Sequence, residues 1–180
     1  MSEIPSLLAV LTPFEKEHFL PGDLFESFKT LGKNFQLIDP TDTTPEDFAR
    51  ELHRINPEVL LACWQTPPLP ADLPSNLRYM CYLTGSVQRL VTRQQLEAGI
   101  IVTNWGSAIS RTVAECALFH ALACLRRATK WTFEIHHEKG WRDDWQKVSS
   151  LFERKVGIHG YGAVTREFLK LIQPFDCDIS

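Results

Sequence analysis

The sequence lacks several features that define whole classes of proteins. Its 180 residues contain no basic block, and 19 Lys and Arg stand against 22 Asp and Glu. This balance argues against a surface for nucleic acid or for an anionic membrane. No apolar run approaches the about 18 residues of a membrane-spanning helix. Segment 1–17 has acidic residues where a secretory signal peptide would be positive, so we read its apolar stretch as part of a strand.

Cysteine is present, but not in a pattern that builds a site. The five cysteines are odd in number and include no C-x-x-C pair, which favours neither a disulfide framework nor a bound metal. Cys177, between two aspartates, is the only one outside an apolar segment. A free cysteine in apolar surroundings behaves as a small hydrophobe. We therefore expect reduced thiols in a cytoplasmic, reducing compartment, with four of them buried. These four are Cys63, Cys81, Cys116 and Cys124.

Strands and helices alternate along the first part of the chain. Apolar runs predict strands at 6–13, 35–39, 59–64, 79–84 and 100–104. Helices are expected at 23–31, from a Thr44 cap to Asn56, and after a capping box that starts at Thr92. Four prolines make 66–74 a loop. The alternation predicts an α/β fold in which helices cover both faces of a parallel sheet.

A long helix is predicted from Thr112. The sequence Thr112-Val113-Ala114-Glu115 has the form of a second capping box, and apolar residues recur at positions 114, 118, 121 and 125. The helix is expected to reach His136 or His137, which are adjacent and cannot share a helix face. We favour exposed helix-end histidines over metal or acid–base groups. We also expect Trp131, Trp141 and Trp145 to pack in a domain or subunit interface.

A strand, a glycine turn and a helix follow one another near residue 160. The apolar run 156–158 leads into Gly160-Tyr161-Gly162 and then into a helical segment at 163–172. This order opens dinucleotide-binding folds, where backbone amides at the helix N-terminus bind a pyrophosphate. A tight turn without a ligand is the alternative. Thr165 replaces the third glycine of the motif, so we expect it to push the helix outward or to require a local shift.

Three further features lie around this turn. Asp178 is nearly far enough along the chain to bind a ribose, but we favour a solvated strand residue. His159 is expected to be half-buried and hydrogen-bonded rather than catalytic. The segment 140–152 has no clear period and is interpreted as a crossover.

Two stretches of the chain resemble one known family. YMCYLTGSVQRLVTRQQLEAGIIVTNWGSAISRTVAECAL (79–118) and KVGIHGYGAV (155–164) stand in the order found in the D-isomer-specific 2-hydroxyacid dehydrogenases. The triplet Val113-Ala114-Glu115 and the pair Thr103-Asn104 carry much of the likeness. Recognisable similarity extends over about residues 75–180.

The resemblance implies a domain order and a reaction. A flavodoxin-like substrate domain would occupy 1–137, a crossover 138–152, and the start of a Rossmann domain 153–180. The implied reaction is reversible hydride transfer between NAD or NADP and a small 2-hydroxy or 2-oxo acid. The long helix from Thr112 resembles the family's dimer arm and implies a homodimer.

The resemblance also implies which residues bind ligands. Substrate carboxylate would lie on the backbone amides of Thr84, Gly85 and Ser86, with a loop glycine and a serine helix cap as the alternative. Thr112, besides its capping role, would face the nicotinamide end of the cleft. The cofactor-binding residues of the turn would be Gly160, Tyr161, Gly162, Ala163 and Val164.

The catalytic arginine, acid and histidine of the family would lie beyond Ser180. We therefore expect the chain to be the N-terminal portion of such an enzyme and to be inactive by itself. The alternative is a non-enzymatic α/β module for ligand binding or dimerisation. Residues 151–180 are expected to pack against a partner chain or to be poorly ordered.

Overall fold

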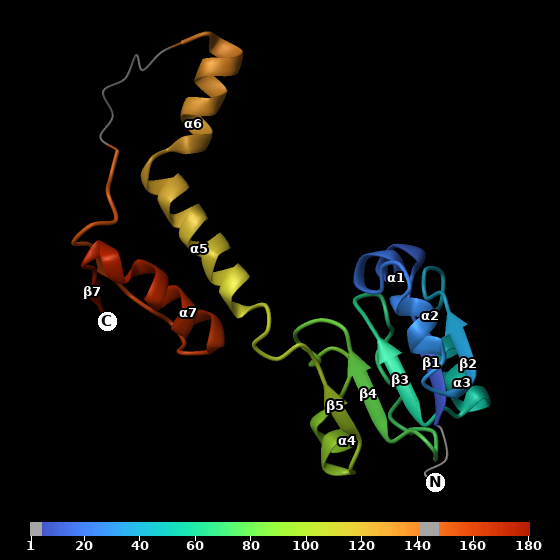
Figure 1. The fold of residues 1–180 in the computed structure, drawn as a ribbon. Coiled ribbons are helices and arrows are strands. Elements are labelled where there is room, and N and C mark those ends of the chain that lie inside the picture. Colours follow the sequence, from blue (N-terminus) through green and yellow to red (C-terminus); the bar gives the residue numbers. More distant parts are fainter. Residues whose placement is uncertain (1–4, 141–147) are drawn as a thin grey trace. The chain divides into compact units, whose positions relative to one another are not determined.

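The computed structural model describes residues 5–140 and 148–180 of the protein, which form two compact units, 1–106 and 107–180 (Figure 1). The first unit is built on a five-stranded sheet in the order β2-β1-β3-β4-β5, with every neighbouring pair parallel. This is the flavodoxin-like strand order. The predicted α/β fold is confirmed. The strands are β1 Ser6–Val10, β2 Lys33–Ile38, β3 Val59–Ala62, β4 Tyr79–Tyr82 and β5 Ile101–Thr103.

Helices cover both faces of this sheet. Successive strand residues point to opposite faces, so Leu8 and Ala9 of β1 enter two different cores. Phe48 and Leu52 are buried in the first core, and Phe19 and Phe28 pack against the second. The helices are α1 Pro13–Phe19, α2 Leu24–Lys29, α3 Pro45–Ile55 and α4 Arg93–Glu97.

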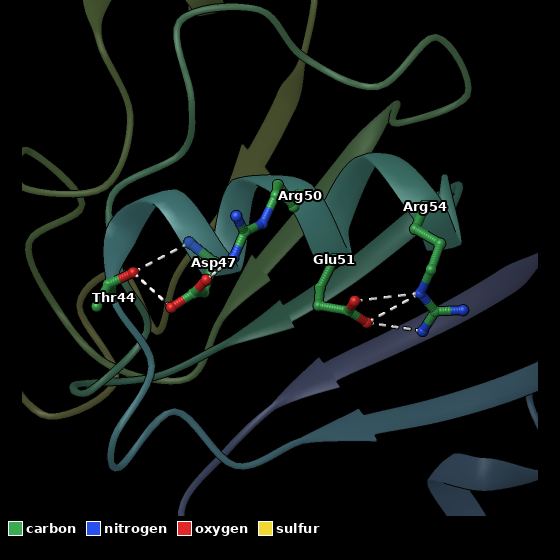
Figure 2. A network of polar contacts seen from close by, with 5 residues as sticks. All are labelled: Thr44, Asp47, Arg50, Glu51 and Arg54. Atoms are coloured by element: carbon green, nitrogen blue, oxygen red, sulfur yellow. Dashed lines mark hydrogen bonds and ion pairs between the residues drawn. The ribbon is translucent and has the colours of Figure 1, made fainter.

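The exposed face of α3 carries a chain of polar contacts (Figure 2). The Thr44 hydroxyl accepts a hydrogen bond from the backbone N–H of Asp47 at 3.1 Å, and Arg50 pairs with the Asp47 carboxylate. One turn further on, Arg54 donates to both carboxylate oxygens of Glu51. This hydrogen bond lowers the pKa of Glu51. Because all these groups are solvated, the contacts support the helix locally and build no site.

Both predicted ends of α3 are confirmed. Thr44 is the N-cap and Pro45 the first helical residue. Asn56 ends the helix in the left-handed region at φ 46°, just before Pro57, which disfavours helical geometry in the preceding residue.

The structure corrects the first predicted strand. We expected a strand over 6–13, but β1 ends at Val10 and α1 begins at Pro13. Thr12 and Glu15 form a reciprocal capping box, with the Thr12 hydroxyl accepting from the Glu15 N–H and the Glu15 carboxylate accepting from the Thr12 N–H. The apolar run before Thr12 concealed this helix start.

The second unit joins a helical arm to a short sheet. Its two strands, β6 and β7, are parallel, and helix α7 between them packs against α5. Ala114 of α5 and Ile172 of α7 are both buried. Segment 148–180 thus packs within its own chain, whereas we expected a partner chain or poor order. The elements are α5 Ser110–Leu125, α6 Ala128–Phe133, a π-helical turn Glu134–Glu138, β6 Lys155–Val156, α7 Ala163–Ile172, a 3-10 turn Gln173–Phe175 and β7 Asp178–Ile179.

The predicted capping box at Thr112 is wrong. Helix α5 begins at Ser110 after Ile109, and no side chain caps it. A turn from Ser107 to Ser110 already starts the helical hydrogen bonds, so Thr112 lies inside the first turn. The predicted stripe is present, because Ala114 is buried and positions 118, 121 and 125 are partly buried. The helix breaks at Arg127, where φ is 53°.

Two of the four cysteines expected to be buried are exposed. Cys63 is buried and Cys81 partly buried, but Cys116 and Cys124 lie exposed on α5. Apolar residues surround α5, so apolar sequence neighbours do not mean that a side chain is covered. All five thiols are free, as expected.

Other predictions in the second unit have mixed outcomes. His136 and His137 are exposed, as expected, and His137 stacks on Phe133. His159 is exposed rather than half-buried, because β6 ends at Val156. Trp131 is partly buried, while Trp141 and Trp145 lie outside the described residues. The expected domain limits (1–137, 138–152 and 153–180) stay a prediction.

Candidate functional site

The loop after β4 lies at the carboxyl edge of the first unit's sheet. In open parallel sheets ligands bind in the crevice outside the carboxyl ends of the strands. The loop contains Thr84, Gly85 and Ser86, and the next helix starts only at Arg93, so Ser86 caps no helix. Within the described part of the chain, neither the Gly85 N–H nor the Ser86 N–H donates a hydrogen bond. Both residues are exposed to solvent.

Two polar side-chain atoms beside this loop also lack partners among the described residues. They are the Thr84 hydroxyl, in a side chain only 2% exposed, and the Trp105 indole nitrogen. The indole nitrogen lies 3.6 Å from the position that a Cβ of Gly85 would take. The backbone N–H of Trp105 donates to the Thr84 carbonyl at 3.3 Å, and the Asn104 side-chain amide donates to the Gly85 carbonyl. These contacts use the carbonyl groups of Thr84 and Gly85, whereas the amide groups of Gly85 and Ser86 have no partner among the described residues.

Five aromatic side chains form a connected group at the same edge, here called the aromatic group. Phe19 lies at its centre, with its ring 4.8 Å from Trp64 and 6.0 Å from Trp105. His18 stacks on Phe14 at 5.4 Å and lies 6.3 Å from Trp64. The sequence interpretation missed this group. The available signal was position, since Trp64 and Trp105 each stand two residues after a strand end.

Glu15 anchors α1, which carries three of these aromatic residues. Its carboxylate is 1% exposed and accepts from the Thr12 N–H at 2.9 Å and the Gln65 N–H at 2.8 Å. The second contact joins α1 to the loop that holds Trp64. Arg89 donates to the Trp64 carbonyl. Neighbouring Cys63 is no nucleophile, because burial raises the pKa of its thiol to about 12.

The glycine turn in the second unit has the geometry of an anion-binding helix start. Gly160 has φ +94°, which favours glycine. Gly162 is extended, is the N-cap of α7 and gives the first-turn amides no side-chain partner. A Cβ at Gly162 would meet nothing within 4 Å, so packing in the chain does not require glycine there. The space in front of the α7 N-terminus is therefore open to a ligand that approaches the backbone closely.

Thr165 fits the turn without the outward push that we considered. Its hydroxyl donates to the Gly160 carbonyl at 2.9 Å and so ties the first turn of α7 to the glycine turn. Tyr161 and Val164 are exposed, and Ala163 is partly buried. Asp178 is an exposed residue within β7, in agreement with a solvated strand position.

Thr112 lies exposed in the first turn of α5, and the structure places no partner against its hydroxyl among the described residues.

The same described residues contain no cluster of three or more His, Cys, Asp or Glu that could hold a metal ion. They also contain no helix with the length and apolar character needed to cross a bilayer.

A flavodoxin-like sheet followed by a strand, glycine turn and helix defines an α/β protein of the dinucleotide-binding class. Residues 118–180 match the family model for the D-isomer specific 2-hydroxyacid dehydrogenase, NAD binding domain. The resemblance to the D-isomer-specific 2-hydroxyacid dehydrogenase family that we saw in the sequence is confirmed.

Relatives agree with this assignment. Glyoxylate/hydroxypyruvate reductase HPR3 of Arabidopsis thaliana is 30% identical over 117 residues, which are 64% of this chain and 36% of the relative. Hydroxypyruvate reductase of Thermotoga maritima is 28% identical over 133 residues, or 72% of this chain and 43% of the relative. The chain thus spans less than half the length of these curated relatives.

A solved structure supports the fold. A glyoxylate reductase from Paecilomyes thermophila superposes with a TM-score of 0.77 over 99% of this chain and 55% of that one. At 17% sequence identity this likeness concerns the fold alone.

Proposed function

We propose that residues 1–180 bind the reactants for hydride transfer between NAD or NADP and a small 2-hydroxy or 2-oxo acid. The observation that carries the proposal lies at the N-terminus of α7. A Cβ at Gly162 would meet nothing within 4 Å, so packing within the chain does not explain why this residue is glycine. The family match to an NAD-binding domain supports it. The named activities of the relatives, reduction of glyoxylate and hydroxypyruvate, indicate the substrate class.

In this proposal the chain's own residues bind and orient the reactants. Amides at Tyr161, Gly162, Ala163 and Val164 hold the pyrophosphate, and Gly160 provides the turn that aims them. When bound, the nicotinamide supplies or accepts the hydride. Thr112 is assigned to the nicotinamide end.

The substrate binds through its carboxylate in the first unit. The free amides of Gly85 and Ser86 hold the carboxylate oxygens, and the unpaired Thr84 hydroxyl lies beside them. Charge-assisted hydrogen bonds from preorganised amides are strong, so this loop fixes the orientation of the acid.

We further propose that residues 1–180 by themselves do not catalyse this hydride transfer. They supply one strand–helix–strand unit, β6-α7-β7, whereas a dinucleotide binds between two β-α-β-α-β halves. Incubation with NADH and glyoxylate, hydroxypyruvate or pyruvate should leave the NADH absorbance unchanged. Steady NADH oxidation would overturn this part of the proposal.

Cofactor binding is the direct test. The change Gly162→Val places a branched side chain in front of the α7 amides and should abolish NADH binding measured by calorimetry. Gly157→Ala is the matched control, since its Cβ also meets nothing within 4 Å but lies before the turn. Equal NADH affinity in the Gly162→Val chain and the unchanged chain would contradict the assigned site.

We propose a homodimer through α5. Its exposed Val113 and Phe119 lie on a helix with apolar residues all round, a pattern typical of buried helices. Light scattering should show a dimer that Phe119→Glu converts to monomer. Leu31→Glu, at an equally exposed apolar residue of the first unit, should leave the dimer intact. Dimerisation without NADH binding would favour the non-enzymatic module instead.

A further inference from the structure

Two kinds of ligand-binding group lie at the carboxyl edge of the first unit's sheet. One is the anion-binding loop with the free amides of Gly85 and Ser86. The other is the aromatic group, which connects to that loop through Trp105, because the Trp105 indole lies against Gly85 and its ring contacts Phe19. The aromatic group therefore extends from the loop, through Trp105 and Phe19, to Trp64.

Several rings of the aromatic group are not used by the core. Phe14 is 64% exposed and Trp64 42% exposed, and His18 between them is exposed as well. The Phe14 and His18 rings are nearly parallel, with an interplanar angle of 12°. Large exposed apolar side chains that gather at a ligand-binding edge are typical of recognition surfaces.

These rings are held in place rather than left mobile on the surface. Glu15 joins α1 to the Gln65 amide, and Arg89 binds the Trp64 carbonyl. The two strand ends that carry Trp64 and Trp105 belong to the same sheet. A preorganised aromatic wall loses little entropy when a flat ligand packs against it.

We propose that the preferred substrate carries an aromatic ring on the carbon next to its 2-oxo or 2-hydroxy group, and that Phe14, His18 and Trp64 bind that ring. This inference rests on the proposed function, since it takes the acid to bind at the loop. It makes the three residues determinants of specificity, while the loop amides bind the carboxylate common to all these acids.

Lactate and phenyllactate form a matched ligand pair for the test. They share the carboxylate and the 2-hydroxyl group and differ only by the phenyl ring. Titration of the full chain, followed by two-dimensional nitrogen–proton NMR, resolves even weak binding at single residues. Lactate should shift the amides of Gly85 and Ser86 alone. Phenyllactate should also shift the Trp64 indole signal and bind about 10-fold more tightly.

Two variants and a control separate specificity from stability. Phe14→Ala and Trp64→Ala should each reduce the preference for phenyllactate towards 1 and leave lactate binding unchanged. Because Phe14 is mostly exposed, its loss should not unfold the chain. Phe133→Ala is the matched control, because Phe133 forms a similar stack on His137, four residues along, in the second unit.

The outcomes distinguish this inference from the proposed function. If both acids shift the loop amides with equal affinity and the Trp64 signal stays in place, the aromatic site is refuted and the carboxylate loop stands. If neither acid shifts the loop amides at millimolar concentration, the loop assignment fails together with the aromatic site.

Discussion

The buried carboxylate of Glu15 offers a sharp test of how the first unit holds its aromatic edge. We consider Glu15→Ala. The change removes an acceptor that serves the Thr12 N–H, the Thr12 hydroxyl and the Gln65 N–H. Losing the helix cap costs about 1 kcal/mol. Leaving the Gln65 amide without its partner costs about 1–3 kcal/mol more. We therefore expect a total loss of about 2–4 kcal/mol in the free energy of unfolding.

A second substitution tests the hydrogen-bond reasoning separately from side-chain volume. Glu15→Gln keeps the size of the side chain but replaces one acceptor oxygen with an amide donor. That donor would face one of two backbone N–H groups, so about 1–3 kcal/mol should still be lost. If Glu15→Gln were as stable as the unchanged chain, the hydrogen bonds would not be the source of the effect.

Urea unfolding followed by circular dichroism measures both variants. The control is Glu17→Ala on the same helix, whose side chain is exposed and whose loss should stay within about 0.5 kcal/mol. Hydrogen exchange at the Gln65 amide should accelerate only in the Glu15 variants. A Glu15→Ala chain that unfolds within about 0.5 kcal/mol of the Glu17→Ala chain would refute the reasoning.

Two other expectations concern the sheet's two cores. Phe48→Ala should lower the free energy of unfolding by about 3–5 kcal/mol, because this fully buried ring fills the space between α3 and the sheet; a urea titration that finds less than half of this would contradict the core assignment. The buried Cys63 thiol should resist alkylation in the native chain and react in urea, as mass spectrometry of the peptide would show. Since burial raises its folded pKa to about 12 while the unfolded thiol ionises near 9.0, stability should fall as pH rises from about 9 to 12. Cys63→Ala should remove that part of the decline, and an unchanged alkaline slope would count against it.

Local sequence signals predicted elements well where nothing else competed with them. Thr44, Pro45 and Asn56 predicted both ends of α3, because a cap, a fixed φ and a left-handed residue each act within one turn. The same reasoning failed at two similar patterns. Thr12 caps α1 but follows an apolar run that concealed it, and Thr112 caps nothing because a turn has already started α5. A capping pattern works only where the preceding residues are not yet helical.

The candidate site divides in the same way. The loop at Gly85 and the turn at Gly160 each lie between a strand and the helix or turn that follows it, and their order along the chain indicated the family. The aromatic group was not predictable by such reasoning. Its members come from α1 and from the ends of β3 and β5, and the sequence alone does not say that these ends are neighbours.

The sequence by itself therefore determined the α/β class, both ends of α3 and the resemblance to the family, because these depend on contacts within a few residues or on the order of motifs. Only the tertiary structure decided which strand ends share an edge, that Glu15 is buried, and that Cys116 is exposed. Burial and proximity depend on how distant segments pack. The parallel pairing of β1, β3, β4 and β5 brings residues up to about ninety positions apart to one edge of the sheet.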